Sequence, residues 1–384
     1  MTWKASGIVD ERVRFISAVQ RGEDDISSLC RQYGISRKTG YKWIDRAARG
    51  EALTDRSRAP LSCPGMTDER VRDLILDARH THPTWGPRKL LAWLGRKHPR
   101  IDLPAASTAG ELLKRSGLIR PRRVRTRPEG NASGLSEMNA ANAVWCADFK
   151  GSFKTGDGRV VNALTITDGF SRYLLRCKAM SLTHTELVQR VYDSVFREFG
   201  LPVMIRTDNG PPFAGMGPRG LSKLGVWLLK LGVLLERTAP GKPTQNGRHE
   251  RMHRTLKEDT ASPPAKTFRL QQQRFDLFTR TFNEERPHEA LDNKTPASIY
   301  TASPRRYPVK LREFEYPDHF ELRRVKRNGE IKWSGEFTYV CEPLAGELVA
   351  IERRDDGTCG VYFGPLALGG LDEEGRFDRT LRGP

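Results

Sequence analysis

Residues 144–177 read VWCADFKGSFKTGDGRVVNALTITDGFSRYLLRC, and this stretch decides the fold. It holds three short apolar runs, 144–149, 160–167 and 173–177, separated by turn-forming residues. Such spacing predicts three consecutive strands. Downstream, apolar patterns of helical and strand type alternate: a helix ending at Phe199, a strand over 203–207, a helix over 221–231, a strand over 233–237 and a helix over 243–259. This order predicts a mixed sheet, antiparallel at first and then extended by crossover units.

Three carboxylates occupy particular places in this pattern. Asp148 interrupts the first apolar strand, Asp208 ends the fourth strand, and Glu250 lies in the last helix. A carboxylate inside an apolar strand is costly without a partner or a function, and open sheets bind ligands at the carboxyl ends of their strands. The element order is that of a ribonuclease H sheet, in which the first and fourth strands are neighbours. We therefore expect the three carboxylates to converge.

Converging carboxylates in a basic protein require counter-cations. Oxygen ligands, with few histidines and no paired cysteines, select Mg²⁺ or Mn²⁺, and carboxylates that leave positions open for phosphate suit two ions per site. Two such ions activate an attacking oxygen and stabilise the leaving one, so the sequence predicts phosphodiester cleavage or transfer. Each carboxylate also has an ordinary explanation: a satisfied buried Asp148, a turn-forming Asp208 before Asn-Gly, and a surface Glu250.

The overall charge favours a polyanionic partner. The chain of 384 residues carries 65 Lys and Arg against 47 Asp and Glu, a formal net charge of +18, which points to nucleic acid. The longest apolar stretch, 225–235, is broken by Lys230 and is too short to cross a membrane. With no secretory signal in the sequence either, we expect a cytoplasmic protein, associated with the nucleoid when bound to DNA. Six scattered cysteines predict reduced thiols in packing positions and no zinc site.

Residues 1–52 predict a helix-turn-helix domain. Three short amphipathic segments, 9–19, 26–33 and 38–47, are joined at the last break by Gly34, which permits a left-handed turn. The third helix would present a basic face to a DNA major groove. Its residues are Arg37, Lys38, Tyr41, Lys42, Trp43 and Arg46. The alternative is a helical hairpin with a solvated charged face.

Two further segments extend the predicted DNA-binding surface. Residues 65–120 predict a second helical, helix-turn-helix-like DNA-binding domain, with helices opening at Thr67 and Pro87 and a third over 107–117. Residues 121–140 predict a basic linker arm lying along DNA, because a dense arginine run repels itself unless phosphates neutralise it. The arm residues expected to bind DNA are Arg122, Arg123 and Arg125.

The remaining boundaries are 141–302 for the catalytic core and 310–384 for a small C-terminal β-barrel, in a multidomain α/β chain. Asn328-Gly329 and Asp356-Gly357 are typical hairpin turns in the last part. Four basic residues precede the first of these turns and suit contact with a DNA backbone, or else protect a solvated edge. They are Arg323, Arg324, Lys326 and Arg327.

Five ordered motifs resemble those of insertion-sequence transposases with a retroviral-integrase-type catalytic core, the class bearing an Asp, Asp, Glu triad. They are 145–149, 167–172, 207–213, 243–250 and the tail 282–291, which together cover about residues 140–300. The resemblance implies that Asp148, Asp208 and Glu250 are catalytic metal ligands. It also implies DNA contact by Lys257, with Arg254 on the same helix face. The 41 residues between Asp208 and Glu250 exceed the commonest family spacing, with the excess in 214–220.

Other polar residues of these motifs are weaker candidates. Asp168 follows the second strand and is interpreted as turn chemistry. His249, His253 and His288 could approach DNA, although a solvated helix face is at least as good an interpretation for the first two. The neighbouring Gln245 and Asn246 could line a substrate channel.

The resemblance implies a DNA transposase. It would bind the terminal inverted repeats of its element, cut the strand end with the help of metal, and use the freed 3′-hydroxyl to attack target DNA. Its partners would be double-stranded DNA, both element ends and target, and further copies of itself in a homo-oligomer on paired ends. Two alternatives stay open: a non-enzymatic DNA-binding regulator derived from a transposase, and a structure-selective nuclease of the same fold.

Overall fold

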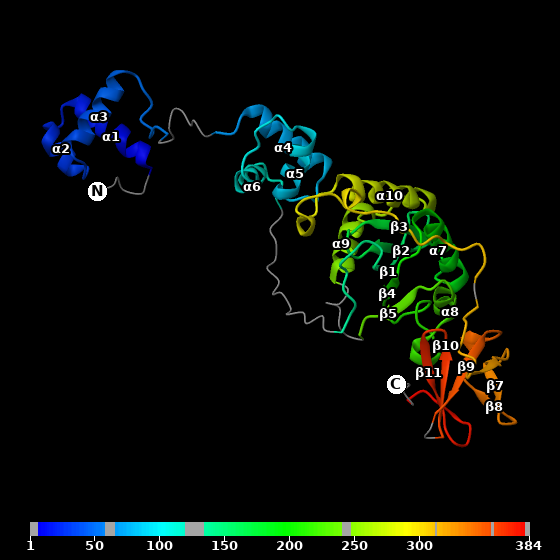
Figure 1. Ribbon diagram of the computed structural model, residues 1–384. Helices are drawn as coiled ribbons and strands as arrows, with labels where there is room; N and C mark the ends of the chain where they lie inside the picture. The colour runs from blue at the N-terminus through cyan, green and yellow to red at the C-terminus, as the bar shows by residue number, and fades with distance from the viewer. Residues whose placement is uncertain are drawn as a thin grey trace. The chain divides into compact units, whose positions relative to one another are not determined.

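A computed structural model describes residues 7–57, 66–119, 134–239, 247–311, 313–354 and 357–380. Its internal contacts divide the chain into two units, Met1–Met66 and Thr67–Pro384, and each is described by itself (Figure 1). Six residues named above lie outside the described ranges: Arg122, Arg123, Arg125, Gln245, Asn246 and Asp356. No helix in the described part of the chain is long and apolar enough to cross a membrane.

The first unit is the predicted helix-turn-helix. Its helices are α1 (Ile8–Arg21), α2 (Ile26–Gln32) and α3 (Arg37–Ala48). Asp25 caps α2, Ser36 caps α3, and Gly34 takes the left-handed conformation (φ 67°) between them. Phe15 and Leu29 are buried among the three helices.

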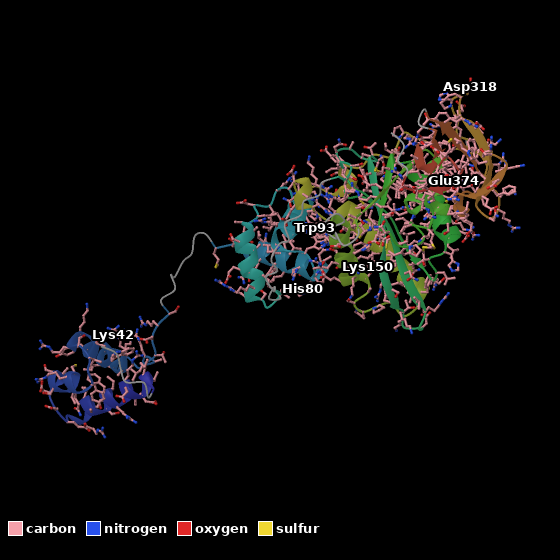
Figure 2. All side chains as sticks on the ribbon, turned by 90° about the horizontal axis from the view of Figure 1, so that it is seen from below. Lys42, His80, Trp93, Lys150, Asp318 and Glu374 are labelled. Carbon is pink, nitrogen blue, oxygen red and sulfur yellow. The ribbon has the colours of Figure 1, made fainter. Side chains whose placement is uncertain are left out.

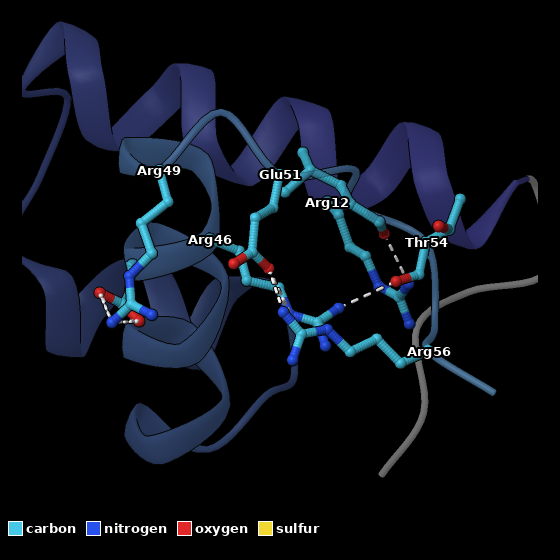
Figure 3. Close-up of polar contacts among 8 residues, drawn as sticks. Arg12, Arg46, Arg49, Glu51, Thr54 and Arg56 are labelled. Atoms are coloured by element: carbon cyan, nitrogen blue, oxygen red, sulfur yellow. Dashed lines mark hydrogen bonds and ion pairs between the residues drawn. The ribbon is translucent and has the colours of Figure 1, made fainter. Parts of the chain in front are cut away.

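Part of the expected basic face of α3 is used inside this unit, which corrects the sequence interpretation. Trp43 is only 1% exposed and lies 3.9 Å beneath the Arg12 guanidinium. Arg12 donates to the Leu53 carbonyl (2.7 Å), and Arg46 donates to the Thr54 carbonyl (2.9 Å) (Figure 3). These bonds hold the segment after α3 in place. Its backbone carbonyls lie outside any helix or sheet, so side-chain donors take the place of backbone partners. The residues that stay exposed are Arg37, Lys38, Tyr41 and Lys42, the last labelled in Figure 2.

The second unit begins with three helices around their own apolar cluster. They are α4 (Glu69–Thr81), α5 (Pro87–Lys97) and α6 (Ala106–Arg115). The cluster includes Ile75, Leu90 and Leu113. The helix cap is Asp68, which accepts from the Arg70 N–H at 2.8 Å, and not Thr67 as expected.

A five-stranded mixed sheet follows, with the order β3-β2-β1-β4-β5. Its strands are β1 (Val144–Lys154), β2 (Val160–Asp168), β3 (Leu174–Met180), β4 (Met204–Thr207) and β5 (Leu234–Arg237). The first three pair antiparallel, whereas β1–β4 and β4–β5 pair parallel. The predicted mixed sheet is therefore confirmed, with the first and fourth strands adjacent.

Helices cover both faces of this sheet (Figure 1). They are α7 (Thr185–Phe199), α8 (Lys223–Lys230), α9 (Gly247–Thr260) and α10 (Phe268–Arg280). On one face α7 and α8 pack against Trp145 and Ala147, and on the other α9 and α10 pack against Val161 and Ala163. Because side chains alternate along a strand, Asp148 points to the α9 face.

The tail motif after α10 ties this face to the sheet edge. Asn283 accepts from the Leu174 N–H (2.8 Å) and donates to the Leu174 carbonyl (2.9 Å), so its amide continues the ladder of β3. Arg96 of α5 donates to the carbonyls of Glu285 and Asn293 at 2.7 and 3.0 Å. The motif is thus a structural connection among the sheet, α10 and the second helical region.

The C-terminal strands form open sheets, and the expected small barrel is not found among the residues described for this region. They are β6 (Glu321–Arg324), β7 (Glu330–Trp333), β8 (Glu336–Tyr339), β9 (Leu348–Arg353), β10 (Cys359–Phe363), β11 (Leu366–Leu371) and β12 (Phe377–Asp378). One sheet has the order β12-β11-β10-β9-β6, and β7 with β8 makes a second. Their apolar side is shared with Leu221, Val226 and Leu229 in and beside α8. Residues 325–329 lead the chain from the first sheet into the second, and β6 and β12 are the two opposite edges of the first sheet.

The hairpin turn in this region differs from the prediction. Asn328-Gly329 turns the chain between different sheets, whereas Ser334 (φ 48°) and Gly335 (φ 91°) join the paired strands β7 and β8. Positive φ at both central residues is what a two-residue hairpin of this twist requires. Three of the basic residues before Asn328 are already engaged by neighbours. Arg323 donates to Glu321, Arg324 to the Gly346 carbonyl, and Lys326 lies over the Phe337 ring.

Candidate active site

Asp148 and Asp208 lie at the same level of two adjacent parallel strands. The β1–β4 register pairs Cys146 with Arg206, and Asp148 lies two residues later within β1, whereas Asp208 directly follows the end of β4 at Thr207. Adjacent strands are ~4.8 Å apart, so the two carboxylates meet where β4 ends, beside the middle of β1. The topology therefore brings together two of the three predicted ligands.

The Asp208 turn is shaped by the residues that follow it. The Gly210 N–H donates to the Asp208 Oδ1 at 3.1 Å, and Asn209 donates to the Thr238 carbonyl at 2.7 Å. A Cβ atom at Gly210 would lie 3.2 Å from the Asp208 Oδ2. The Asp-Asn-Gly sequence thus fixes the carboxylate and leaves the space beside it free.

Glu250 lies in α9, on the helix that covers Asp148, and its side chain is exposed. Burial, then the negative charge of Asp208 and, less strongly, that of Glu250, raise the pKa of Asp148 from 3.8 to about 7. Both carboxylates therefore act electrostatically on the same group. Mutual repulsion of this kind is relieved by a bound cation.

His249 and His253 are buried, which corrects the expectation of a solvated helix face. They are 2% and 5% exposed, on the side of α9 that faces the sheet. Their Nε2 atoms lie 2.7 and 2.6 Å from the Thr165 hydroxyl of β2, and the His249 Nδ1 is 3.1 Å from the Thr167 hydroxyl. Burial lowers the pKa of His249 to about 3 and that of His253 to about 2, so both rings are neutral.

The Thr165 hydroxyl determines where the protons of these rings lie. We assign its one proton to the Asp148 carbonyl at 3.1 Å, and with this assignment both histidines donate to it from Nε2. The Nδ1 lone pair of His253 then faces the Asp148 Oδ2 at 3.7 Å. Because the ring is neutral, this contact is not an ion pair. A proton on Asp148 or a cation between the two groups would satisfy both.

This donor set fits a divalent cation. One ligand atom from each of Asp148, His249 and His253 lies within 4.8 Å of the others, and the charges of Asp208 and Glu250 act on Asp148. Carboxylate oxygens suit Mg²⁺ or Mn²⁺. The histidines already bond Thr165 and Thr167, so their rings hold α9 against β2.

Two lysines border the carboxylates, and one of them was missed from the sequence. Arg254 and Lys257 are exposed one and two turns after Glu250, as expected. Lys150, labelled in Figure 2, follows Asp148 by two residues on β1, and its charge lowers the Asp148 pKa. Lys150 and Lys257 also line a cavity of about 120 Å³ with Phe153. The period of two along a strand was the signal that could have identified Lys150.

Asp168 is a structural residue, in agreement with the turn interpretation. It is fully buried, and its oxygens accept from the Asn142 N–H (2.7 Å), the Ser171 N–H (2.8 Å) and the Ser171 hydroxyl (2.6 Å). No oxygen of this carboxylate is directed at the cluster around Asp148. Asp168 instead anchors the loop between β2 and β3.

The chain is similar to known families in its N-terminal helical part and in its five-stranded sheet region. An integrase core domain matches residues 138–243 and 231–296, a helix-turn-helix domain matches 11–60, and a homeodomain-like domain matches 39–113. The uncharacterized 31.7 kDa protein of insertion element IS407 from Burkholderia multivorans is 27% identical over 243 residues, covering 62% of this chain and 82% of the relative. The uncharacterized 39.2 kDa protein of insertion element IS476 from Xanthomonas euvesicatoria is 25% identical, covering 63% and 67%.

Among solved structures, the catalytic core domain of HTLV-2 integrase, determined in complex with magnesium, matches with a TM-score of 0.34 and 16% identity. That match covers 42% of this chain and 98% of the other.

Proposed function

We infer that this chain binds the terminal inverted repeats of its element and transfers a cut strand end into target DNA. Its integrase core domain and its insertion-element relatives support its identity as an insertion-sequence transposase. DNA integration and transposition are the general activity of this family. The terminal-repeat binding, the strand cleavage and the attack by the freed 3′-hydroxyl are the specific steps that we propose for this chain.

The observation that carries the proposal is the meeting of Asp148 and Asp208 where β4 ends, beside β1, beneath the helix that bears Glu250. Three carboxylates at one place, in a chain of net charge +18, suit an anionic substrate that arrives with cations. The raised pKa of Asp148 supports their proximity. A purely structural role would leave these acids paired with arginine or lysine.

Asp148, Asp208 and Glu250 would hold two Mg²⁺ or Mn²⁺ ions. Bound there, such ions supply activation of the attacking oxygen and stabilisation of the leaving oxygen at phosphorus. The chain itself supplies orientation: Arg254 and Lys257 lie along the same helix as Glu250 and suit the phosphates beside the reacting one. The neutral rings of His249 and His253 hold α9 against β2, which fixes the height of Glu250 above the aspartates.

The remaining parts of the chain suit DNA recognition. Arg37, Lys38 and Lys42 are exposed on the third helix of the first unit and would read the element ends. We keep 1–52 and 65–120 as two DNA-binding domains, 121–140 as a basic arm, 141–302 as the core and 310–384 as the C-terminal domain. We expect the protein to act in the cytoplasm on nucleoid DNA, as a homo-oligomer on paired ends.

A strand-joining assay tests this function. Incubating the full chain with labelled duplexes of the element ends, a target plasmid and Mg²⁺ should give joined products, and omitting the metal should abolish them. Binding without any cut or joined product in Mg²⁺ or Mn²⁺ would favour the non-enzymatic regulator. Cutting of branched DNA without end-specific joining would favour the nuclease.

A further inference from the structure

Two of the sequence motifs, 167–172 and 282–291, are not used by the carboxylate site, and Arg172 of the first lies near His288 of the second. Arg172 ends the loop between β2 and β3, and His288 follows the tail that is anchored by Asn283. The charge of Arg172 acts on His288, and the charges of Arg248 and Arg251 act on Arg172. The four residues therefore form one cluster beside α9, here called the arginine cluster.

The arginine cluster has hydrogen-bond capacity that the protein does not fill. The Arg172 Nε and the His288 Nε2 are buried atoms without a partner in the described part of the chain. Arg172 also holds a left-handed backbone conformation (φ 65°), which is uncommon outside glycine. The His288 ring is neutral, since burial lowers its pKa to about 3, and it bonds the Phe282 backbone, so its Nε2 is an acceptor. The Arg172 Nε–H is a buried donor left unpaired, which is costly and calls for an anionic ligand.

Acidic neighbours do not neutralise the cluster. Within the described residues Arg172, Arg248 and Arg251 form no ion pair, since the nearby Asp168 has its oxygens bound by Asn142 and Ser171. Burial and then the charges of Arg248 and Arg251 lower the pKa of Arg172 to about 10. Like charges held together in this way are stabilised by an anion.

Arg248 connects α9 to the β2–β3 loop, which carries Arg172. The Arg248 guanidinium donates to the Gly169 carbonyl at 3.1 Å and lies 3.2 Å from the Met138 Sδ, which fixes it against the β2–β3 loop. Arg251 is exposed one turn further along. Since residues three apart on a helix are neighbours, Arg254, Arg251 and Arg248 form a continuous cationic path that leads from the Glu250 side of α9 to Arg172.

We propose that Arg172, Arg248 and Arg251 bind a phosphodiester group of the DNA whose reacting phosphate lies at the carboxylates. This rests on the proposed function. A phosphate oxygen accepts from the unpaired Arg172 Nε–H, and guanidinium groups match its geometry. The DNA backbone would pass around α9, with Arg254 between the two phosphate sites.

The test is the salt dependence of DNA binding by the full chain, measured in a chelator so that no chemistry occurs. Arg251→Gln removes an exposed charge without touching the packing, and Arg269→Gln on α10 is the matched control, since it is also exposed. Each lost phosphate contact should flatten the slope of log affinity against log salt by ~0.9, about an eightfold loss near 0.1 M salt. Arg172→Gln should do the same, and its circular dichroism and melting curve show whether it folds.

The outcomes separate this inference from the proposed function. A wild-type chain that joins strands, with an Arg251→Gln slope equal to that of wild type, overturns the phosphate site and leaves the transposase standing. If Arg251→Gln flattens the salt slope but the wild-type chain joins no strands, the phosphate site stands and the transposase proposal is wrong. Inorganic phosphate serves as a further probe: if it raises the melting temperature of wild type but not of Arg251→Gln, while DNA slopes are unchanged, the site takes a free anion and the DNA proposal is wrong.

Discussion

We expect Asp148 to couple metal binding to protonation. Its pKa near 7 lies above the unfolded value of 3.8, so the protonated group stabilises the metal-free fold below about pH 4, and this contribution is lost as the pH rises through 7. A metal ion must displace that proton. We expect the rise in melting temperature produced by Mg²⁺ to be larger at pH 8 than at pH 6, measured by calorimetry. An equal rise at both pH values, or a rise retained in Asp148→Asn, would contradict the assignment of Asp148 as a ligand.

Thr165 is the residue on which the two buried histidines depend. Thr165→Val keeps the shape of the side chain but leaves two buried ring N–H groups without an acceptor, which should cost about 1–3 kcal/mol of unfolding free energy. Thr279→Val is the control, because that hydroxyl bonds a carbonyl one turn back in its own helix. Equal denaturant midpoints for the two variants would show that the histidines have another proton arrangement.

The role of a single residue was predictable where the pattern of its own strand determined it. It was not predictable where a contact with a residue far along the chain determined it. Asp148 stands out because a carboxylate interrupts an apolar run. The burial of His249 and His253 depends on Thr165, 84 and 88 residues away, whose hydroxyl receives both rings. On the helix alone, their charged neighbours favour a solvated face, which is why that expectation failed.

At the scale of elements, the Asn283 amide is the bond between the tail motif and the sheet. Replacing it in Asn283→Leu leaves the Leu174 N–H and carbonyl unpaired inside the protein, at about 1–3 kcal/mol for each group. We expect a marked loss of melting temperature, together with faster hydrogen exchange at β3. A variant that melts like wild type would show that β3 does not need this support.

The sequence predicted the order of the elements correctly, but it did not predict how the C-terminal strands pair. Alternating apolar positions identify β1 to β3, and their neighbours follow from chain order. By contrast, Asn328-Gly329 and Ser334-Gly335 both permit a turn, and only the pairing of β7 with β8 decides which one closes a hairpin. Local turn chemistry cannot distinguish the two, because both turns flank β7 and the outcome depends on which neighbouring strand pairs with it.

At the scale of the whole molecule, one chain supplies one set of three carboxylates, whereas an element has two ends. We expect at least two protomers on paired ends, since both ends must be cut and joined together. Light scattering with and without end duplexes measures the mass. A strictly one-to-one complex that still joins both ends would refute the oligomer.

The most direct test of the account compares Asp148→Asn, Asp208→Asn and Glu250→Gln with wild type in the strand-joining assay with Mg²⁺. Each variant should lose cleavage and joining while its melting curve and end binding stay near those of wild type, because the exposed residues of α3 that would read the ends lie in the other unit. Glu258→Gln, exposed on the same helix as Glu250, is the control and should remain active. Near-normal joining by any of the three variants would contradict the assignment of a shared metal site.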